Sequence, residues 1–343
     1  MKKHLNTLFI TTQGTYLAKE GETITVKVEQ ETRARIPIHT LAGIVCFGNV
    51  TCSPFLMGFC AENDVSISFL TQYGRFLAQV KGPVSGNVLL RRQQFRMADS
   101  QEDSARVAGF ILSGKLANCR KVLERAIRDH GDKVNHAAIK KVSGRLFYYV
   151  QKGLLHDNLD KLRGIEGESA QLYFSVFNEL IFTDRESFFF PCRNRRPPTD
   201  RINCLLSFVY TLLVHDVRSA LESAGLDPSV GFLHRDRPGR PGLALDMMEE
   251  LRPFMADRLV LSMINRNQIR PGDFIFRESG AVYLENEARK TVLEAYQKRK
   301  QESITHPFLD EKVQIGDLFF IQSLLLARFI RGDLDGYPPF LWK

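Results

Sequence analysis

The chain has 343 residues, of which 44% are hydrophobic and 25% are charged, and its formal net charge is +8. This length allows two domains with sizeable cores, and the positive charge favours a polyanionic partner, nucleic acid above all. The sequence contains no apolar run of about eighteen residues and no apolar signal-peptide core, so we expect neither a transmembrane helix nor a signal peptide. Six scattered cysteines form no CxxC pair, which argues against a zinc ribbon or a disulfide framework and fits the cytoplasm.

Residues 1–84 are predicted to form a small β domain. Short β-branched or aromatic runs separated by glycine turns predict strands at 8–10, 16–18, 23–28, 36–38 and 43–47. A short helix is expected at 53–63 and a hairpin over 65–80. No catalytic group of residues is evident in this part of the chain.

Residues 85–343 are predicted to form a larger, all-α domain, which makes the fold class α+β. Gly82-Pro83 and Ser85-Gly86 mark the boundary between the two domains. Apolar periodicity predicts helices at 87–97, 104–130, 133–152, 170–182, 199–224, from 243 onward, 286–302 and 313–330. The Gly/Pro-rich, aromatic tail at 332–343 is predicted to be a packed or interface segment, with a substrate contact as the alternative interpretation.

A glutamate between two glycines precedes the apolar helix predicted at 170–182. Glu166 follows Gly164 and is followed by Gly167, and such small neighbours let a substrate or another helix approach the carboxylate. A solvent-exposed turn acid is the alternative interpretation.

A basic loop precedes the helix predicted at 199–224. Arg193, Arg195 and Arg196 stand before the stiff pair Pro197-Pro198, and arginines offer bidentate contacts to phosphates. A solvated basic loop is the alternative interpretation.

A histidine, a Pro/Gly-rich loop and two acids follow one another between residues 231 and 253. His234 precedes a loop that contains Arg235, Arg237 and Arg240, and Asp246 and Glu249 share one helix face. Imidazole with carboxylates suits Mg²⁺ or Mn²⁺, and adjacent arginines suit a phosphate substrate. Alternatively, the histidine is an ordinary hydrogen-bonding residue and the acids favour the helix dipole.

Together these motifs resemble the CRISPR-associated integrase family that acts in spacer acquisition, the Cas-one family. The resemblance rests on the order and spacing of GIEGESA at 164–170, RNRRPPTDRINCLLSFVYTLL at 193–213, AGLDPSVGFLHRDRPGRPGLALD at 224–246 and MMEELRPFMAD at 247–257. The tail GDLDGYPPFLWK is similar to that of the type I-C branch.

The resemblance implies that Glu166, His234 and Glu249 are catalytic and bind Mg²⁺ or Mn²⁺. Asp246 matches a second acid, which either supports the site or helps to hold a metal. The implied reaction joins the 3′-hydroxyl ends of new spacer DNA to the repeat array by transesterification, and water in place of the hydroxyl gives an endonuclease. As a hypothesis, the DNA path is lined by Arg163, Arg193, Arg195, Arg196, Arg235, Arg237 and Arg240.

The resemblance also implies double-stranded DNA as substrate, a homodimer built through the β domains and a small ferredoxin-like partner of the Cas-two family. Two alternatives remain open from the residues alone. One is a metal-dependent, structure-specific DNA nuclease of repair, and the other is a non-enzymatic DNA-binding subunit. A zinc enzyme is disfavoured, because the ligand set lacks cysteine and a second well-placed histidine.

Overall fold

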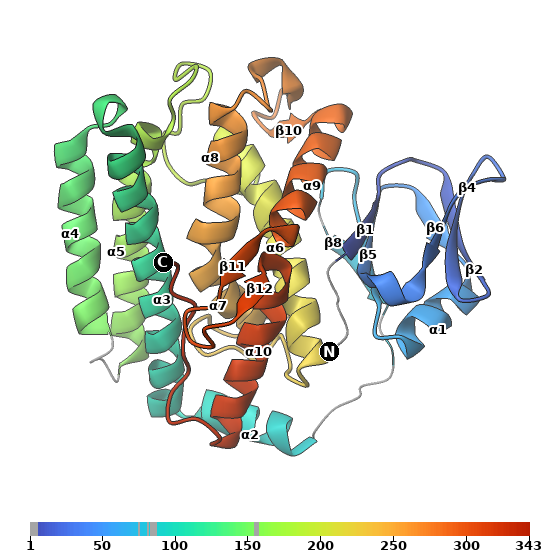
Figure 1. Ribbon diagram of the computed structural model, residues 1–343, viewed down its shortest axis with the longest axis horizontal. Coiled ribbons are helices and arrows are strands. Elements are labelled where there is room, and N and C mark those ends of the chain that lie inside the picture. The colour runs from blue at the N-terminus through green and yellow to red at the C-terminus, as the bar shows by residue number, and fades with distance from the viewer. Residues whose placement is uncertain (1–5, 75, 81, 83–87, 154–157) are drawn as a thin grey trace. The chain divides into compact units, whose positions relative to one another are not determined.

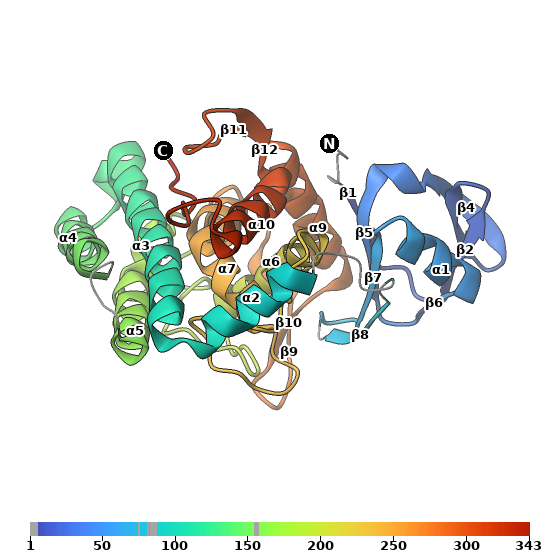
Figure 2. The ribbon, with the colours of Figure 1, turned by 90° about the horizontal axis from the view of Figure 1, so that it is seen from below.

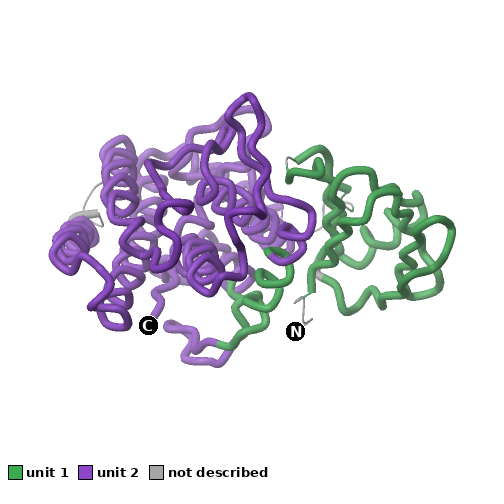
Figure 3. Tube along the Cα trace, turned by 90° about the horizontal axis from the view of Figure 1, so that it is seen from above, with its two compact units in different colours: residues 1–86, 292–303, 314–318 green, residues 87–291, 304–313, 319–343 purple. Residues whose placement is uncertain are grey.

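The computed structural model describes residues 6–74, 76–80, 82, 88–153 and 158–343 (Figure 1). The chain divides into two compact units, coloured separately in Figure 3. The first unit comprises residues 1–86, 292–303 and 314–318, and the second comprises 87–291, 304–313 and 319–343. The boundary predicted between residues 84 and 85 lies outside the described residues, so it stays a prediction.

The first unit contains two four-stranded sheets. One sheet has the order β1-β5-β7-β8, in which β1, β5 and β7 are parallel and β8 is antiparallel to β7. The other has the order β4-β3-β2-β6, in which β6 is parallel to β2. The strands are β1 (Asn6–Ile10), β2 (Thr15–Glu20), β3 (Thr23–Val28), β4 (Glu31–Pro37), β5 (Leu41–Phe47), β6 (Val50–Cys52), β7 (Ser66–Leu70) and β8 (Phe76–Val80).

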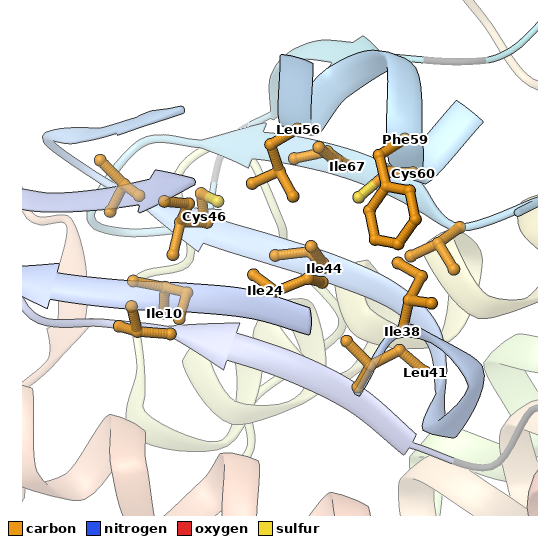
Figure 4. Packing of buried hydrophobic residues seen from close by; sticks show 14 residues of the cluster. Ile10, Ile24, Ile38, Leu41, Ile44, Cys46, Leu56, Phe59, Cys60 and Ile67 are labelled. Carbon is orange, nitrogen blue, oxygen red and sulfur yellow. The ribbon is translucent and has the colours of Figure 1, made fainter. Parts of the chain in front are cut away.

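One hydrophobic core joins both sheets to helix α1 (Pro54–Glu62) (Figure 4). Ile44 and Ile67 come from the first sheet, Ile24 from the second, and Leu56 from the helix. Ser53 fixes the start of α1, because its side chain accepts a hydrogen bond from the Leu56 amide. The predicted strands, helix and hairpin of this region are therefore confirmed, and β6 is an additional strand that the sequence pattern did not indicate.

The second unit is mostly helical, which confirms the α+β fold class, but it is not all-α. Its long helix α3 packs against α4, α5 and α7 (Figures 1 and 2). Two two-stranded sheets, β9–β10 and β11–β12, correct the all-α expectation. The helices are α2 (Val88–Asp99), α3 (Gln101–His130), α4 (His136–Gly153), α5 (Leu159–Ser175), α6 (Arg201–Ser223), α7 (Gly242–Leu251), α8 (Arg258–Asn265), α9 (Asn286–Gln301) and α10 (Ile315–Arg331), the last two crossing the division between the units.

The remaining elements are short. They are the 3₁₀ turns η1 (Ile38–Thr40), η2 (Gly131–Lys133), η3 (Phe177–Leu180) and η5 (Pro271–Asp273), the π-helical turn η4 (Arg252–Asp257), and the strands β9 (Phe274–Phe276), β10 (Val282–Leu284), β11 (Ser303–Thr305) and β12 (Lys312–Gln314). The π turn joins α7 directly to α8, and such turns are frequent at functional sites.

Glu166 lies within a helix, not in a turn before one. Helix α5 begins at Leu159, because the side chain of Asn158 accepts hydrogen bonds from the amides of Asp160 and Lys161. The helix then continues through both glycines to Ser175. The capped start and the packing of α5 against α3 and α4 therefore outweigh the low helix propensity of Gly164 and Gly167.

Helix α6 is the one described helix that is long and apolar enough to cross a membrane by length and composition. Within the structure, 61% of that apolar window is buried. A core helix of a soluble domain has the same properties, so α6 needs no membrane to explain its composition.

Candidate active site

Three helices of the second unit meet at a buried lysine. Lys115 of α3 places its Nζ 2.5 Å from Glu166 Oε1 of α5 and 2.7 Å from Glu249 Oε2 of α7. The side chains of Lys115 and Glu249 are only 8% and 2% exposed, whereas that of Glu166 is 30% exposed. The two acids predicted from the sequence therefore share one cation and form a partly open site.

The buried pair Lys115 and Glu249 is held in its ionised form. Burial alone would lower the pKa of Lys115, but the carboxylates of Glu249 and Glu166 raise it above its usual value. Burial alone would raise the pKa of Glu249, but Arg252 and Lys115 lower it. Arg252, at the start of η4, pairs with Glu249 Oε1.

His234 is oriented by Asp246, which is fully buried. The Asp246 carboxylate accepts hydrogen bonds from the amides of Phe232, Leu233 and His234, and its Oδ1 lies 2.5 Å from His234 Nδ1. Donation from Nδ1 leaves the Nε2 lone pair available for a ligand, an arrangement typical of metal-binding histidines. Asp246 has no unused position for a metal, so we infer that it positions His234.

A glycine allows this loop to approach α7. A Cβ on Gly231 would lie 2.7 Å from the Gly242 carbonyl carbon and 2.8 Å from Asp246 Oδ2, which is too close for any other residue. The loop before His234 is therefore fixed against the first turn of α7.

The donor set has the chemistry that a divalent ion needs. Across the described residues, no group of three or more His, Cys, Asp or Glu side chains has metal-binding geometry, and Lys115 lies between the two glutamates. The position between the two carboxylates nevertheless accepts a cation, and His234 is close enough to lower the pKa of Glu249. One imidazole and two carboxylates fit Mg²⁺ or Mn²⁺.

A cavity of about 440 Å³ opens beside this cluster and is lined by arginines. Arg193, Arg195 and Arg196 line it together with Lys115, Glu166 and Arg252. The loop that contains Arg237 and Arg240 reaches the same region. Burial lowers the pKa of Arg240, and the nearby positive charges of Arg237, Arg195 and Arg196 lower it further. Four arginines from two distant loops, Arg195, Arg196, Arg237 and Arg240, thus form one positive cluster.

The other three predicted DNA-binding arginines make bonds within the protein. Arg163 Nε donates to the Leu233 carbonyl at 2.7 Å, which joins α5 to the His234 loop. Arg193 lines the cavity but donates to Asn203 and Ser207 of α6. Arg235 is largely exposed and pairs with Asp160.

Three groups in the site escaped the sequence interpretation. Lys115 stands on the apolar stripe of α3, four residues after Ile111 and four before Cys119, and a lysine in that position is a signal of a buried partner. Arg252 was part of a matched motif but received no role. The buried acid Asp257, which lines the cavity and accepts a hydrogen bond of 2.6 Å from Tyr210, ends the same motif and also received no role.

Comparisons with known proteins identify the family of this chain. The family model described as CRISPR associated protein Cas1 matches residues 8–298. The CRISPR-associated endonuclease Cas1 1 of Chlorobaculum tepidum is 56% identical over 343 residues, which cover the full length of both chains. The Cas1 protein of Thermotoga maritima shares the fold with a TM-score of 0.82 and 25% identity, over 98% of this chain and 100% of that one.

Two further structures share the fold at lower identity. A casposase bound to integration product has a TM-score of 0.82 and 20% identity, over 98% of this chain and 94% of that one. A chain of a Cas6-RT-Cas1–Cas2 complex has a TM-score of 0.81 and 22% identity, over 100% of this chain and 36% of that one. The extent of the family match and the full-length relative show that this chain belongs to the Cas1 family of CRISPR-associated endonucleases.

Proposed function

We propose that this chain is a metal-dependent DNA integrase of CRISPR adaptation, which joins the 3′-hydroxyl ends of spacer DNA to the repeat array by transesterification. The observation that carries the proposal is the convergence of Glu166 and Glu249 on one cationic group beside an arginine-lined cavity. With water as the nucleophile, the same site acts as an endonuclease.

Glu166, His234 and Glu249 would hold Mg²⁺ or Mn²⁺. The bound ion would neutralise charge on the reacting phosphate and on the leaving 3′-oxygen. Such charge neutralisation, together with positioning, provides most of the catalysis of phosphodiester transfer. Asp246 keeps His234 in the tautomer that offers Nε2. Arg252 keeps Glu249 ionised in its buried position.

The arginine cluster binds the DNA backbone. Arg195, Arg196, Arg237 and Arg240 together present positive charge, so they attract phosphates and fix the strand beside the carboxylates. A Cβ on Gly164 or Gly167 would meet no atom within 4 Å, so this part of α5 beside Glu166 is open.

The partners of this protein follow from its relatives. Solved structures with the same fold are named as a Cas1–Cas2 complex and as a casposase bound to integration product. We infer a homodimer built through the β unit, bridged by a small ferredoxin-like Cas2 partner, acting on double-stranded DNA in the cytoplasm. The type I-C-like assignment also stays a prediction, since the names of these relatives give no subtype.

A strand-transfer assay tests the proposal. Protein and Mn²⁺ are mixed with a labelled short duplex and a supercoiled plasmid that carries a repeat, with and without the Cas2 partner. His234→Ala is compared with His136→Ala, a matched change at an exposed residue of α4. We expect label to join the plasmid with the wild type and with His136→Ala, but not with His234→Ala.

The other outcomes select the alternatives. Nicking without joining would favour a structure-specific nuclease of repair. DNA binding without any metal-dependent product, equal in both histidine variants, would leave a non-enzymatic DNA-binding subunit as the better account.

A further inference from the structure

The C-terminal segment, residues 332–343, is built into the protein behind the proposed site. Tyr337, Phe340 and Trp342 are buried, whereas Leu341 is 43% exposed. The Phe254 ring of η4 lies 5.1 Å from the Phe340 ring and 5.4 Å from that of Trp342. In both ribbon views the C-terminus lies beside α3 (Figures 1 and 2).

Glu250 of α7 is the main anchor of this segment. Its carboxylate is fully buried, and Oε1 accepts hydrogen bonds from the Tyr337 hydroxyl at 2.6 Å and from Gln322 Nε2 at 3.0 Å. Its Oε2 accepts a hydrogen bond from the Phe340 amide at 3.0 Å. The neighbouring Glu249 pairs with cationic side chains, whereas Glu250 directs both carboxylate oxygens to the tail and to α10.

Asn118 of α3 is the second anchor. Its Nδ2 donates to the carbonyl oxygens of Glu250 at 2.7 Å and of Phe340 at 2.8 Å, and its Oδ1 accepts from the Trp342 amide at 2.8 Å. One fully buried amide side chain therefore connects α3, α7 and the tail. All three of these partners are main-chain groups, so the connection fixes backbone positions.

Both anchors adjoin residues of the proposed site. Asn118 lies three positions after Lys115 on α3, and Glu250 follows Glu249 directly on α7. Helix α3 is also in close contact with the tail and with α7 at Gly114, since a Cβ there would lie 2.8 Å from Pro339 Cβ and 3.1 Å from Glu250 Cβ. Any shift of the tail would therefore be transmitted to the two helices that carry the Lys115–Glu249 pair.

We propose that the C-terminal segment is a clasp that holds α3 and α7 at the spacing the cation site requires, with Glu250 and Asn118 as positioning residues. The inference rests on the proposed function in one respect, since it takes Glu249 as a ligand. Glu250 has no role in binding the ion itself. It acts through the backbone of α7, as residues behind a metal site commonly do.

Gln322 of α10 is a third residue that supports the clasp. Gln322 of α10 donates to Glu250, and its Oε1 lies 3.0 Å from Nε2 of the buried His306. The Nδ1 of His306 accepts from the amides of Phe308 and Leu309, so Nε2 carries the proton and donates to Gln322. The orientation of Gln322, and with it the donor that faces Glu250, is thereby fixed.

Conservative variants test the clasp without deleting it. Tyr337→Phe removes one hydroxyl and keeps the ring, and Glu250→Gln keeps the volume but replaces one of the two acceptor oxygens by an NH₂ donor, so that either the Phe340 amide or the Tyr337 and Gln322 donors lose their acceptor. Leu341→Ala is the matched control, because it truncates an exposed side chain of the same segment. Two quantities are measured at a temperature where every variant is folded: Mn²⁺ affinity by calorimetry, and amide hydrogen exchange of α3 and α7 in metal-free protein.

We expect Mn²⁺ affinity to fall about tenfold in Tyr337→Phe and Glu250→Gln, and to stay unchanged in Leu341→Ala. Amides around Lys115 and Glu249 should exchange faster in the first two variants. Unchanged Mn²⁺ affinity, with faster exchange confined to the tail, would overturn the clasp. If the wild type binds no Mn²⁺, the proposed function fails, and the exchange pattern alone then decides whether the clasp exists.

Discussion

The ammonium group of Lys115 lies 2.7 Å from Glu249 Oε2, and both side chains are almost completely buried. The same ammonium group lies 2.5 Å from Glu166 Oε1, so a residue of α3 occupies the cationic position between two predicted metal ligands. A buried carboxylate without a counter-charge is costly. Lys115 therefore supplies the counter-charge that lets this site fold without an ion, and we expect the proposed metal to bind by replacing it.

Replacing Lys115 should make folding depend on metal. In Lys115→Met the metal-free protein loses the partner of two carboxylates, and we expect its free energy of unfolding to fall by about 3 kcal/mol. Mn²⁺ should restore much of that loss, because it binds the folded state of the variant without displacing a lysine. The check is thermal unfolding with and without Mn²⁺, with Lys140→Met on exposed α4 as the control. Stabilisation by Mn²⁺ that is larger in the wild type than in Lys115→Met would contradict this exchange.

Asp246→Asn should weaken metal binding, although all four contacts of the Asp246 carboxylate are with protein groups. The amide can keep one acceptor oxygen, but its NH₂ group replaces an acceptor that now serves a main-chain amide or His234 Nδ1. We expect Mn²⁺ affinity to fall by about 10- to 100-fold, together with a loss of stability. Asp236→Asn in the exposed part of the same loop is the control. Equal Mn²⁺ affinity in the two variants would show that the His234 tautomer is unimportant.

The sequence predicted well those features that depend on local patterns. The β-branched runs of the first unit and the long apolar periodicity of α3 each depend on neighbouring residues, so these elements appear where they were expected, whereas the helix predicted at 170–182 is instead the end of α5 followed by the turn η3. The family resemblance indicated Glu166, His234 and Glu249, and the structure brings the two glutamates together. It also indicated both arginine loops, which meet at Arg240.

Features that depend on long-range contacts could not be predicted. Lys115 is 51 residues from Glu166 and 134 from Glu249, and no local pattern connects these positions. Gly164 and Gly167 suggested a turn, but the cap at Asn158 and packing against α3 make that segment helical. The sequence places Asp246 and Glu249 on one helix face. Only the structure shows that Asp246 binds the His234 loop, whereas Glu249 pairs with the ammonium group of Lys115.

Neutralising the arginine cluster should reduce the salt dependence of DNA binding. The slope of log K against log salt falls by about one unit for each DNA phosphate that the protein no longer neutralises. We expect the double variant Arg195→Gln/Arg196→Gln to lower the slope by up to about two units. The check is DNA affinity measured between low and moderate salt by fluorescence anisotropy.

Arg163→Gln is the informative comparison for that experiment. Arg163 donates to the Leu233 carbonyl and to Asp160, so its replacement should disturb the His234 loop and leave the salt slope nearly unchanged. If Arg163→Gln lowered the slope as much as a single change at Arg195, then Arg163 would contact phosphate in the complex. An unchanged slope in the double variant would instead show that Arg195 and Arg196 contact no DNA phosphate and belong to a solvated loop.

The acid at the far side of the cavity should make stability fall as the pH rises. Burial raises the pKa of Asp257 from 3.8 to about 6, although the Tyr210 hydroxyl and Arg252 oppose the rise. The folded state therefore holds this proton more tightly than the unfolded state does. The resulting stability is fully present below about pH 4 and is lost as the pH rises through 6.

A variant that cannot titrate isolates this effect of Asp257. The side chain of Asp257→Asn carries no ionisable proton, so the wild type should lose stability relative to this variant between about pH 4.5 and 7.5. Urea unfolding of both proteins across that range measures the difference. Tyr210→Phe, which removes a donor to the carboxylate, should move the loss to higher pH. A difference between wild type and Asp257→Asn that is constant with pH would mean that Asp257 is already ionised at the acidic end of the range, paired with the arginines of the cavity.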